Sequence, residues 1–362
     1  MASKKILIHG SINTANFGDV LFAELFYNYI KNNNIGQPHF LSTPHLGISD
    51  YVRDYISYRE KFRLKDLKEA SLIVFMSGGY FGDAKKTFRG SLTRWAKYAF
   101  VYYYARLLRI PMAVCGVGGG PLYHWFNRRS FSSLLKYARY ATVRDEQTRD
   151  YFEKLGVHNK ILTTTDSALV ITGKSYHTLN SNVKEELHGA IGNKKKIFVH
   201  VPHVIRVIDA YRKYLIPGMN QFIEKHPDFG VVFITDEQHG VPLDLVKLVE
   251  TDSKYVYHYT TPDQLCAFLD YADLVITAKL HVGIVSSALG KSVLSFPLHV
   301  HKTWRFYSQI GETERTIPLE KMTIEVVVSQ IEKFYSTPIV ISKELRNRAK
   351  QNFTIIQNCF EV

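Results

Sequence analysis

Residues 273–296 read DLVITAKLHVGIVSSALGKSVLSF. Positions 274–277 are uncharged and rich in β-branched residues, which predicts a short buried strand. Positions 282–289 are small and apolar, which predicts a helix that ends at Gly290, and positions 292–296 return to a strand pattern. Strand, turn, helix and strand form the repeating unit of a parallel α/β sheet, so this stretch predicts the fold class.

The turn in this stretch carries Lys279 and His281, between the carboxyl end of a strand and the amino end of a helix. Open α/β sheets bind ligands at that edge, and a helix amino end favours an anion. An ammonium and an imidazole there would suit a phosphate or a carboxylate. The alternative is a turn that only connects two elements, so the interpretation depends on what the rest of the chain supplies.

Length, composition and charge narrow the class of protein. A chain of 362 residues with 46% hydrophobic and 22% charged residues is typical of a globular protein with two domains. The net charge of +13 suits phosphorylated metabolites, nucleic acid or an acidic membrane surface. Because no nucleic-acid-binding motif accompanies the charge, we expect no nucleic-acid partner.

The cysteines and the apolar segments indicate the compartment. Cys115, Cys266 and Cys359 are odd in number and far apart, so they predict neither disulfides nor a metal site, and a cytoplasmic location follows. No signal-peptide core and no run of about 20 apolar residues is present. The aromatic segment 95–108 predicts a helix that is buried, faces a second copy or lies at a membrane surface, so peripheral contact with the inner membrane face stays open.

Strand and helix patterns alternate along the whole chain. Strand patterns fall at 4–9, 72–76, 111–116, 141–145 and 161–164, and again at 197–201, 231–235, 254–257, 274–277 and 293–296. Residues 170–195 are polar without strong periodicity and mark a boundary. The prediction is two Rossmann-like parallel-sheet domains that face each other across a cleft, at 1–172 and 195–340, followed by a helix at 341–362.

Several strand ends in the first half carry polar residues or glycines. Asp19 opens a helix and predicts either a helix cap or a group that orients a sugar hydroxyl. Gly78 and Gly79 follow a strand and allow a ligand to approach the backbone. The glycine run at 116–120 is not a dinucleotide loop, because Pro121 and aromatic residues follow it. Arg144 lies at the carboxyl end of the predicted strand 141–145, much as Lys279 follows the predicted strand 274–277.

Short motifs spread from residue 16 to about residue 311 resemble the polysaccharide pyruvyl transferase family in the order that the family has them. They are NFGD at 16–19, SGG at 77–79, GVGGGPL at 116–122, TVRDEQT at 142–148, TDSAL at 165–169 and KLH at 279–281, with Lys302 and Gly311 trailing. Ser167 stands where the family usually has proline. Lys279 stands where it usually has arginine, so the charge is kept but the planar fork that grips a carboxylate is lost.

The resemblance implies a glycosyltransferase-B-like α/β architecture and a reaction. A pyruvyl group passes from phosphoenolpyruvate to two hydroxyls of a polysaccharide or its precursor, which leaves a pyruvate ketal. The N-terminal domain is expected to hold the saccharide acceptor and the C-terminal domain the donor. No cofactor or metal is expected, phosphoenolpyruvate is the co-substrate, and the acceptor is left open as lipid-linked or free.

The same resemblance assigns roles to residues of this chain. His281 is the expected general acid and Asp19 the base or orienting group, with Asp166 in reserve. The donor anions are expected to meet Arg144, Lys279, Leu280 (through its backbone) and Lys302. The acceptor is expected at Asn16, Gly18 and Gly79. His200, His203 and Arg206 are either further donor contacts or polar loop residues.

Two other functions remain open from the sequence. The first is a nucleotide-sugar-dependent glycosyltransferase of the same architecture, with Glu312 or Glu314 on the ribose. The second is a binding protein for anionic glycans or membranes, driven by the positive charge. The sequence makes no prediction of oligomeric state.

Overall fold

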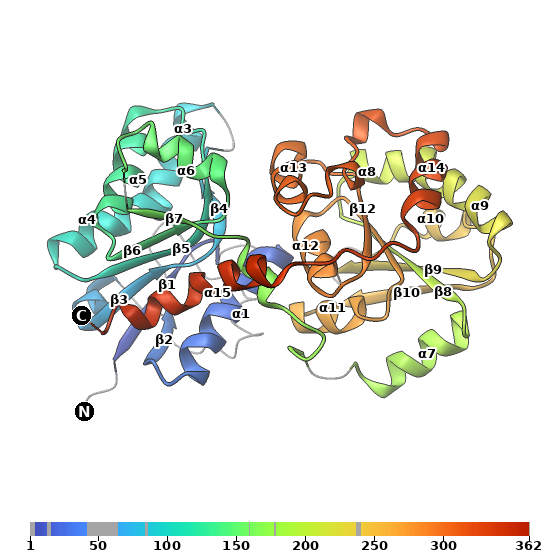
Figure 1. Cartoon of the computed structure of the whole chain (residues 1–362), viewed down its shortest axis with the longest axis horizontal. Coiled ribbons are helices and arrows are strands. Elements are labelled where there is room, and N and C mark those ends of the chain that lie inside the picture. Colours follow the sequence, from blue (N-terminus) through green and yellow to red (C-terminus); the bar gives the residue numbers. More distant parts are fainter. Residues whose placement is uncertain are drawn as a thin grey trace. The chain divides into compact units, whose positions relative to one another are not determined.

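The computed structural model describes residues 4–12, 16–41, 64–83, 86–158, 160–176, 179–236 and 240–361. The chain divides into two compact units: unit 1 is Met1–Val170 with Lys343–Val362, and unit 2 is Ile171–Ser342. Each unit is built on a parallel sheet with helices packed against it (Figure 1). The predicted α/β class with two parallel sheets is therefore confirmed.

The sheet of unit 1 has the strand order β2-β1-β3-β5-β6-β7, and β4 also pairs with β5. Its strands are β1 (Lys5–His9), β2 (Gln37–Phe40), β3 (Ala70–Phe75), β4 (Gly78–Phe81), β5 (Met112–Gly119), β6 (Tyr140–Val143) and β7 (Ile161–Thr163). All of these pairs are parallel. The chain changes direction across the sheet at β1, so β1 and β3 form the edge where such sheets hold ligands.

Helices cover both faces of this sheet. They are α1 (Phe17–Asn32), α3 (Phe88–Arg94), the π-helical turn Trp95–Ala99, α4 (Phe100–Leu107), α5 (Trp125–Tyr137), α6 (Glu146–Glu153) and α15 (Lys343–Asn358), with 3₁₀ turns at Leu64–Glu69 and Ser167–Val170. In Figure 1, α3 and α5 lie on one side of the sheet and α1 and α15 on the other. Strands covered in this way read as unbroken apolar runs, as 72–76 does.

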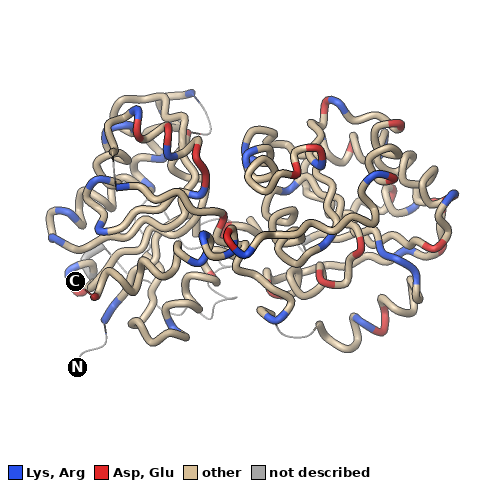
Figure 2. Tube along the Cα trace, in the orientation of Figure 1, with Lys and Arg blue, Asp and Glu red and all other residues tan. Residues whose placement is uncertain are grey.

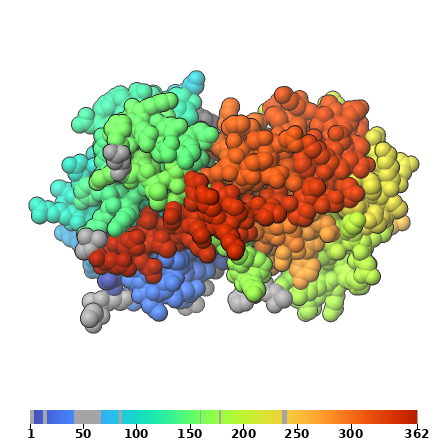
Figure 3. Space-filling model, viewed as in Figure 1, coloured from blue at the N-terminus to red at the C-terminus, as the bar shows by residue number. Residues whose placement is uncertain are grey.

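The C-terminal helix α15 packs on unit 1 although unit 2 precedes it in the chain. The ring of Phe353 lies 4.6 Å from that of Phe26 in α1, centroid to centroid. The Tyr29 hydroxyl donates to Oε1 of Gln357 at 3.1 Å. Figure 3 shows the dark red surface of α15 beside the blue surface of α1. These contacts make α15 part of the apolar core of unit 1.

Unit 2 has the strand order β10-β9-β8-β11-β12, with all pairs parallel. Its strands are β8 (Lys195–His200), β9 (Phe229–Asp236), β10 (Lys254–Tyr259), β11 (Leu274–Thr277) and β12 (Ser292–Ser295). Its helical segments are α7 (Ser181–Ile191), α8 (Ile205–Ala210), a π-helical turn Tyr211–Leu215, α9 (Ile216–Lys225), α10 (Leu243–Lys247), α11 (Pro262–Leu269), α12 (Leu280–Ala288), α13 (Val300–Gln309) and α14 (Ile324–Phe334), with 3₁₀ turns at Thr313–Arg315 and Leu319–Lys321. The strand order reverses between β8 and β11.

The glycine turns of unit 1 differ from the prediction. Gly78 and Gly79 begin β4, which pairs with β5, and the φ of 152° at Gly78 is a conformation that residues with a side chain rarely adopt. Strand β5 runs through the glycine run as far as Gly119, with a register shift between Val114 and Val117. Because the glycines have no Cβ, the side chains of Asn352, Arg144 and Phe152 can lie directly against the backbone of β5.

Two helices of unit 2 were not predicted. Helix α7 lies in the polar stretch 170–195, where only Leu187 and Ile191 of the helix are buried, so its apolar signal is weak. Helix α13 follows β12 and buries Thr303, Phe306 and Tyr307. None of the described helices is both long enough and apolar enough to cross a membrane.

Candidate functional site

The edge of the unit 2 sheet where the strand order reverses carries Lys279. His200, the last residue of β8, lies in register with Thr277, the last residue of β11. The Lys279 backbone N–H then donates to Oγ1 of Thr277 at 3.0 Å, which turns the chain into α12. Lys279 occupies the N-cap position of α12 but gives it no side-chain cap. The amino end of α12 and the Lys279 ammonium are therefore at the same edge of the sheet.

The pKa values of two histidines are lowered in part by the positive charges at this edge. Burial, with a smaller contribution from the Lys279 ammonium, lowers the pKa of His200 to about 3. Burial also lowers the pKa of His299, and the nearby charges of Lys302 and Lys279 add to the effect. Lys279 forms no ion pair with any acidic side chain in the described part of the chain. Positive charge at this edge is thus left available to an anion.

The predicted donor contact Leu280 and the predicted general acid His281 follow Lys279, whereas the predicted donor contact Lys302 lies in α13. Leu280 and His281 form the first turn of α12, and both are half-buried. The helix is fixed in place from α13, because a Cβ at Gly283 would come within 2.9 Å of the Tyr307 hydroxyl. The Ser287 hydroxyl donates back to the Gly283 carbonyl at 2.7 Å. The first half of α12 is therefore packed closely against α13.

The residues considered for other roles in unit 2 have partners of their own. Arg206 pairs with Glu320, Nη2 to Oε1, at 2.6 Å. Glu312 pairs with the buried Arg315 at 2.7 Å. Glu314 pairs with Lys333 at 2.7 Å on the surface. These ion pairs account for Arg206, Glu312 and Glu314 without a ligand.

In unit 1, Arg144 follows β6 and is nearly buried. Its Nη1 lies 3.4 Å from Oδ2 of Asp166, and its Nε lies 3.8 Å from Oδ2 of Asp145. A Cβ at Gly118 would lie only 2.5 Å from Nε of Arg144, so the guanidinium rests against bare backbone. The glycine of the run is needed for that approach. Arg144 is consequently a fixed cation whose charge is balanced by two carboxylates.

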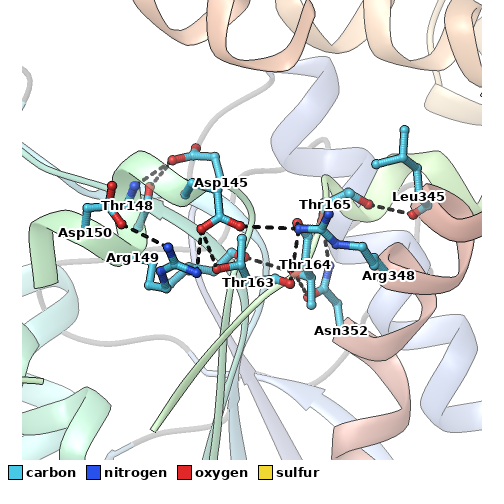
Figure 4. Close-up of polar contacts among 12 residues, drawn as sticks. Asp145, Thr148, Arg149, Asp150, Thr163, Thr164, Thr165, Leu345, Arg348 and Asn352 are labelled. Carbon is cyan, nitrogen blue, oxygen red and sulfur yellow. Dashed lines mark hydrogen bonds and ion pairs between the residues drawn. The ribbon is translucent and has the colours of Figure 1, made fainter. Parts of the chain in front are cut away.

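Asp145 and Asp166 also have backbone roles. Asp145 caps α6, accepting from the N–H and the hydroxyl of Thr148, both at 2.7 Å. Asp166 accepts from the Ala168 N–H at 3.0 Å. Figure 4 shows how this region continues through Thr164 and Thr165 to Asn352 and Arg348 of α15. The reserve base predicted at Asp166 is buried within this network.

The acceptor residues predicted in unit 1 gather at the ends of β1 and β3. Asp19 lies in the first turn of α1, as predicted, but the side chain that caps the helix is Asn16, which accepts from the Gly18 N–H at 3.1 Å. Helix α1 packs against β4, which contains Gly79. Burial raises the pKa of Tyr98, and the charge of Asp19 raises it further, so the two lie near each other.

Three side chains at these edges escaped the sequence reasoning. His299 precedes a helix that was not predicted. Tyr98 was treated as one of several aromatic residues on a helix, yet its hydroxyl lies 3.2 Å from Oγ of Ser11 beside the end of β1. Tyr259, at the end of β10, lies with its hydroxyl 3.4 Å from Nε2 of His200. Tyr259 at the end of β10 and His299 after β12 could have been found from their place at a strand end, whereas Tyr98 lies on a helical turn and gives no such signal.

No group of three or more His, Cys, Asp or Glu side chains within the described residues could hold a metal ion. The three cysteines are free and buried.

Comparison with solved structures identifies the fold. The chain is similar to the UDP-GlcNAc 2-epimerase of Methanocaldococcus jannaschii, with a TM-score of 0.66, 12% identity and coverage of 99% of this chain and 100% of that one. It is also similar to the UDP-GlcNAc 2-epimerase of Neisseria meningitidis bound to UDP-GlcNAc (TM-score 0.61, 12% identity, coverage 99% and 100%) and to the S. aureus MnaA–UDP complex (0.59, 11%, 97% and 91%). These likenesses establish a glycosyltransferase-B-like fold.

Sequence comparison identifies the family. No curated protein matches this chain in sequence. The sequence model of the polysaccharide pyruvyl transferase family matches residues 16–299, which is most of the chain and includes Asp19, Arg144, Lys279 and His281. The chain therefore belongs to the polysaccharide pyruvyl transferase family.

Proposed function

We propose that this protein transfers a pyruvyl group from phosphoenolpyruvate to two hydroxyls of a saccharide and leaves a pyruvate ketal. The observation that carries the proposal is the positive edge of unit 2, where Lys279 has no acidic partner among the described residues and lowers the pKa of two histidines. A small molecule with both a phosphate and a carboxylate matches such an edge. Membership of the family supplies the reaction class.

The donor contacts follow from the groups at this edge. The Lys279 ammonium and the backbone N–H groups that open α12 would hold one anionic group of the donor. Lys302, exposed in the first turn of α13, would reach the other. Because lysine carries one compact charge and no planar fork, we expect this donor site to bind more weakly than a site with arginine at position 279.

The reaction requires one group that can give a proton to the methylene carbon of the bound phosphoenolpyruvate. A sugar oxygen attacks the carbon that bears the phosphate while the methylene carbon takes up a proton and becomes a methyl group. The second hydroxyl then displaces the phosphate, and its proton leaves with that phosphate. His281 lies one residue from Leu280 on the same turn as the Lys279 backbone, so its imidazole is our candidate for the proton donor.

The acceptor would bind unit 1 at the ends of β1 and β3. Asp19, in the first turn of α1, is the carboxylate that would orient or deprotonate a sugar hydroxyl, with Asn16, Gly18 and Gly79 around it. Tyr98 and Ser11 add hydroxyls that could hydrogen-bond a sugar. We also propose Arg144 as a donor contact, in which case a donor anion would share its guanidinium with Asp145 and Asp166.

The rival function is transfer from a nucleotide sugar, because structural neighbours are bound to UDP or UDP-GlcNAc. That function would need an acidic side chain for the ribose. Glu312 and Glu314, the residues considered for it, are already paired with Arg315 and Lys333. The ion pairs favour the pyruvyl transfer over the nucleotide-sugar reaction.

The test is a reaction in D₂O with phosphoenolpyruvate and a panel of free and lipid-linked saccharides. We expect phosphate release and a ketal whose methyl group carries one deuterium, because its third hydrogen comes from solvent. The His281→Ala variant should still bind phosphoenolpyruvate, but its turnover rate should fall by about 100-fold or more. Release of UDP from a nucleotide sugar, with no consumption of phosphoenolpyruvate by any saccharide, would refute the proposal.

A further inference from the structure

Residues 86–143 of unit 1 have an extreme charge composition. They contain ten Lys or Arg and no Asp or Glu, so this segment alone supplies ten of the 13 net positive charges of the chain. Figure 2 marks the Lys and Arg residues of this segment in blue on the tube of unit 1. Eight of the ten are exposed, at positions 86, 89, 106, 109, 128, 129, 136 and 139. An excess this local indicates an anionic partner.

The same segment also exposes large apolar side chains. Six of the 13 that the described residues expose lie in it, including Trp125 at 68% and Phe88 at 61%. Four of the six, together with the partly buried Trp95 and Phe126, form a surface that we call the aromatic face: Phe88, Leu92, Trp95, Tyr103, Trp125 and Phe126 of α3, the π-helical turn, α4 and α5. A contiguous apolar surface with basic neighbours marks an interaction site.

The aromatic face surrounds an apolar cavity of about 410 Å³. The polar tips of its rings are used inside the protein: Nε1 of Trp95 donates to Oγ of Ser130 at 3.1 Å, and the Tyr103 hydroxyl lies 2.9 Å from the same oxygen. Arg129 lies at the cavity as well. Apolar material could therefore enter the cavity without leaving the Trp95 N–H or the Tyr103 hydroxyl unpaired.

A buried network beneath the aromatic face holds it in shape. Asp83, the nearest preceding acidic residue, pairs with Arg94 at 3.4 Å and is almost fully buried. Its carboxylate accepts from the Ser91 hydroxyl at 3.0 Å and from the Tyr123 N–H at 2.9 Å. Asn127 of α5 donates to it at 3.2 Å. These hydrogen bonds connect α3 to the start of α5. Because the Asp83 carboxylate is buried and paired with Arg94, it does not offset the exposed basic residues of the surface.

We propose that the aromatic face binds an anionic phospholipid bilayer, with Trp125, Leu92 and Phe88 entering the headgroup boundary and the exposed arginines contacting lipid phosphates. Exposed Trp, Phe and Leu beside Lys and Arg are the residue types of membrane-interface surfaces. A nucleic acid would leave the apolar cavity without a partner. A two-fold contact with a second copy would set the same positive segment against itself. The proposal does not depend on the reaction proposed above.

Co-sedimentation of the full chain with vesicles tests the proposal. We expect the protein to pellet with phosphatidylcholine vesicles that contain phosphatidylglycerol, and far less with phosphatidylcholine alone. Arg128→Gln with Arg129→Gln should weaken binding about 25-fold, since each charge near an anionic surface contributes about fivefold. Raising the salt should weaken the binding as well. Equal pelleting with both vesicle types would contradict the charge argument.

The apolar part is tested with Leu92→Ser and Trp125→Ser together, which should weaken binding by at least about tenfold. The matched controls are Trp304→Ser, which removes an exposed tryptophan of unit 2 (47% exposed), and the pair Lys225→Gln and Lys247→Gln, which removes two exposed charges there. Both controls should pellet like the wild type. Far-UV circular dichroism checks that each variant is folded.

Three outcomes would overturn the proposal. One is failure to pellet with anionic vesicles at low salt. Another is loss of pelleting to the same extent in the controls. The third is that the protein does not bind vesicles and instead forms a dimer that dissociates when Leu92→Ser and Trp125→Ser are introduced together. Equally, the proposal fails if a DNA duplex displaces the vesicles and binds the Leu92→Ser and Trp125→Ser variant as well as it binds the wild type.

Discussion

Asn352 is the side chain through which α15 is fixed to unit 1. Its Oδ1 accepts from the hydroxyls of Thr142 and Thr164, both at 2.7 Å, and its Nδ2 donates to the Thr165 carbonyl and to Oγ of Ser167, both at 2.9 Å. It is fully buried. In Asn352→Ala, Thr164 and Ser167 keep second partners. The Thr142 hydroxyl still accepts from the Gly116 N–H at 2.6 Å, but its own O–H loses its acceptor, and the Thr165 carbonyl loses its donor.

The expected loss follows from those two orphaned groups. A buried polar group without a partner costs about 1–3 kcal/mol, so Asn352→Ala should lower the free energy of unfolding of unit 1 by about 2–6 kcal/mol. With an m-value of about 2 kcal/mol/M, the urea midpoint should fall by about 1–3 M. The effect on α15 should exceed that of any single exposed substitution on the same helix.

Tryptophan fluorescence can report on unit 1 alone. The three tryptophans are Trp95 and Trp125 in unit 1 and Trp304 in unit 2, so a Trp304→Phe background removes the signal of unit 2. The matched control is Gln351→Ala, which removes an exposed amide from the neighbouring position of α15 and should leave the midpoint nearly unchanged. If Asn352→Ala unfolds at the same urea concentration as Gln351→Ala, the reasoning about this network is wrong.

Further expectations concern single positions. Gly118→Ala should destabilise unit 1 by about 1–3 kcal/mol, because its Cβ would displace the paired guanidinium of Arg144. Gly189→Ala has open space around it in α7 and should stabilise the protein by about 0.5–1 kcal/mol. Thermal melting in which both midpoints move in the same direction would contradict this. His200 should stay neutral in the folded protein down to a pH of about 3 while the unfolded chain takes up its proton near pH 6.5, so its contribution to stability falls as the pH drops through that window, by about 1.4 kcal/mol per pH unit. His200→Gln should flatten the fall of the urea midpoint from pH 7 to pH 5, and an unchanged slope would show that His200 titrates normally. Arg144→Ala should weaken phosphoenolpyruvate binding, as calorimetry would measure, and unaltered affinity would leave Arg144 with a structural role only.

Much of the fold could be predicted because parallel strands buried on both faces give unbroken apolar runs. Residues 274–277 form β11 with the predicted bounds, and α12 begins two residues before its predicted start at position 282. The prediction failed where apolar signal was weak or where glycine was ambiguous. Helix α7 buries two residues only, and Gly78 reads equally well as a turn or as an extended strand that a neighbour can pair.

The site could be predicted in part because strand ends are visible in sequence. Lys279 and His281 were found from their place after a strand. What could not be found was the charge balance around each cation. Asp166 comes next to Arg144 only once β6 and β7 pair, and the absence of an acidic partner at Lys279, within the described residues, depends equally on the fold. His299 was missed because the helix that begins after it was not predicted.

The central claim is that Lys279 provides the positive charge that binds phosphoenolpyruvate, and isothermal titration calorimetry tests it most directly. Lys279→Ala removes a charge-assisted contact worth about 1.5–3 kcal/mol, so the dissociation constant should rise about 10- to 100-fold. Lys225→Ala removes the same charge from the end of α9, just before β9 and thus at the opposite edge of the same sheet, and should leave the affinity unchanged. A wild-type protein that does not bind phosphoenolpyruvate, or a Lys279→Ala variant that binds it as tightly as the wild type, would contradict the account.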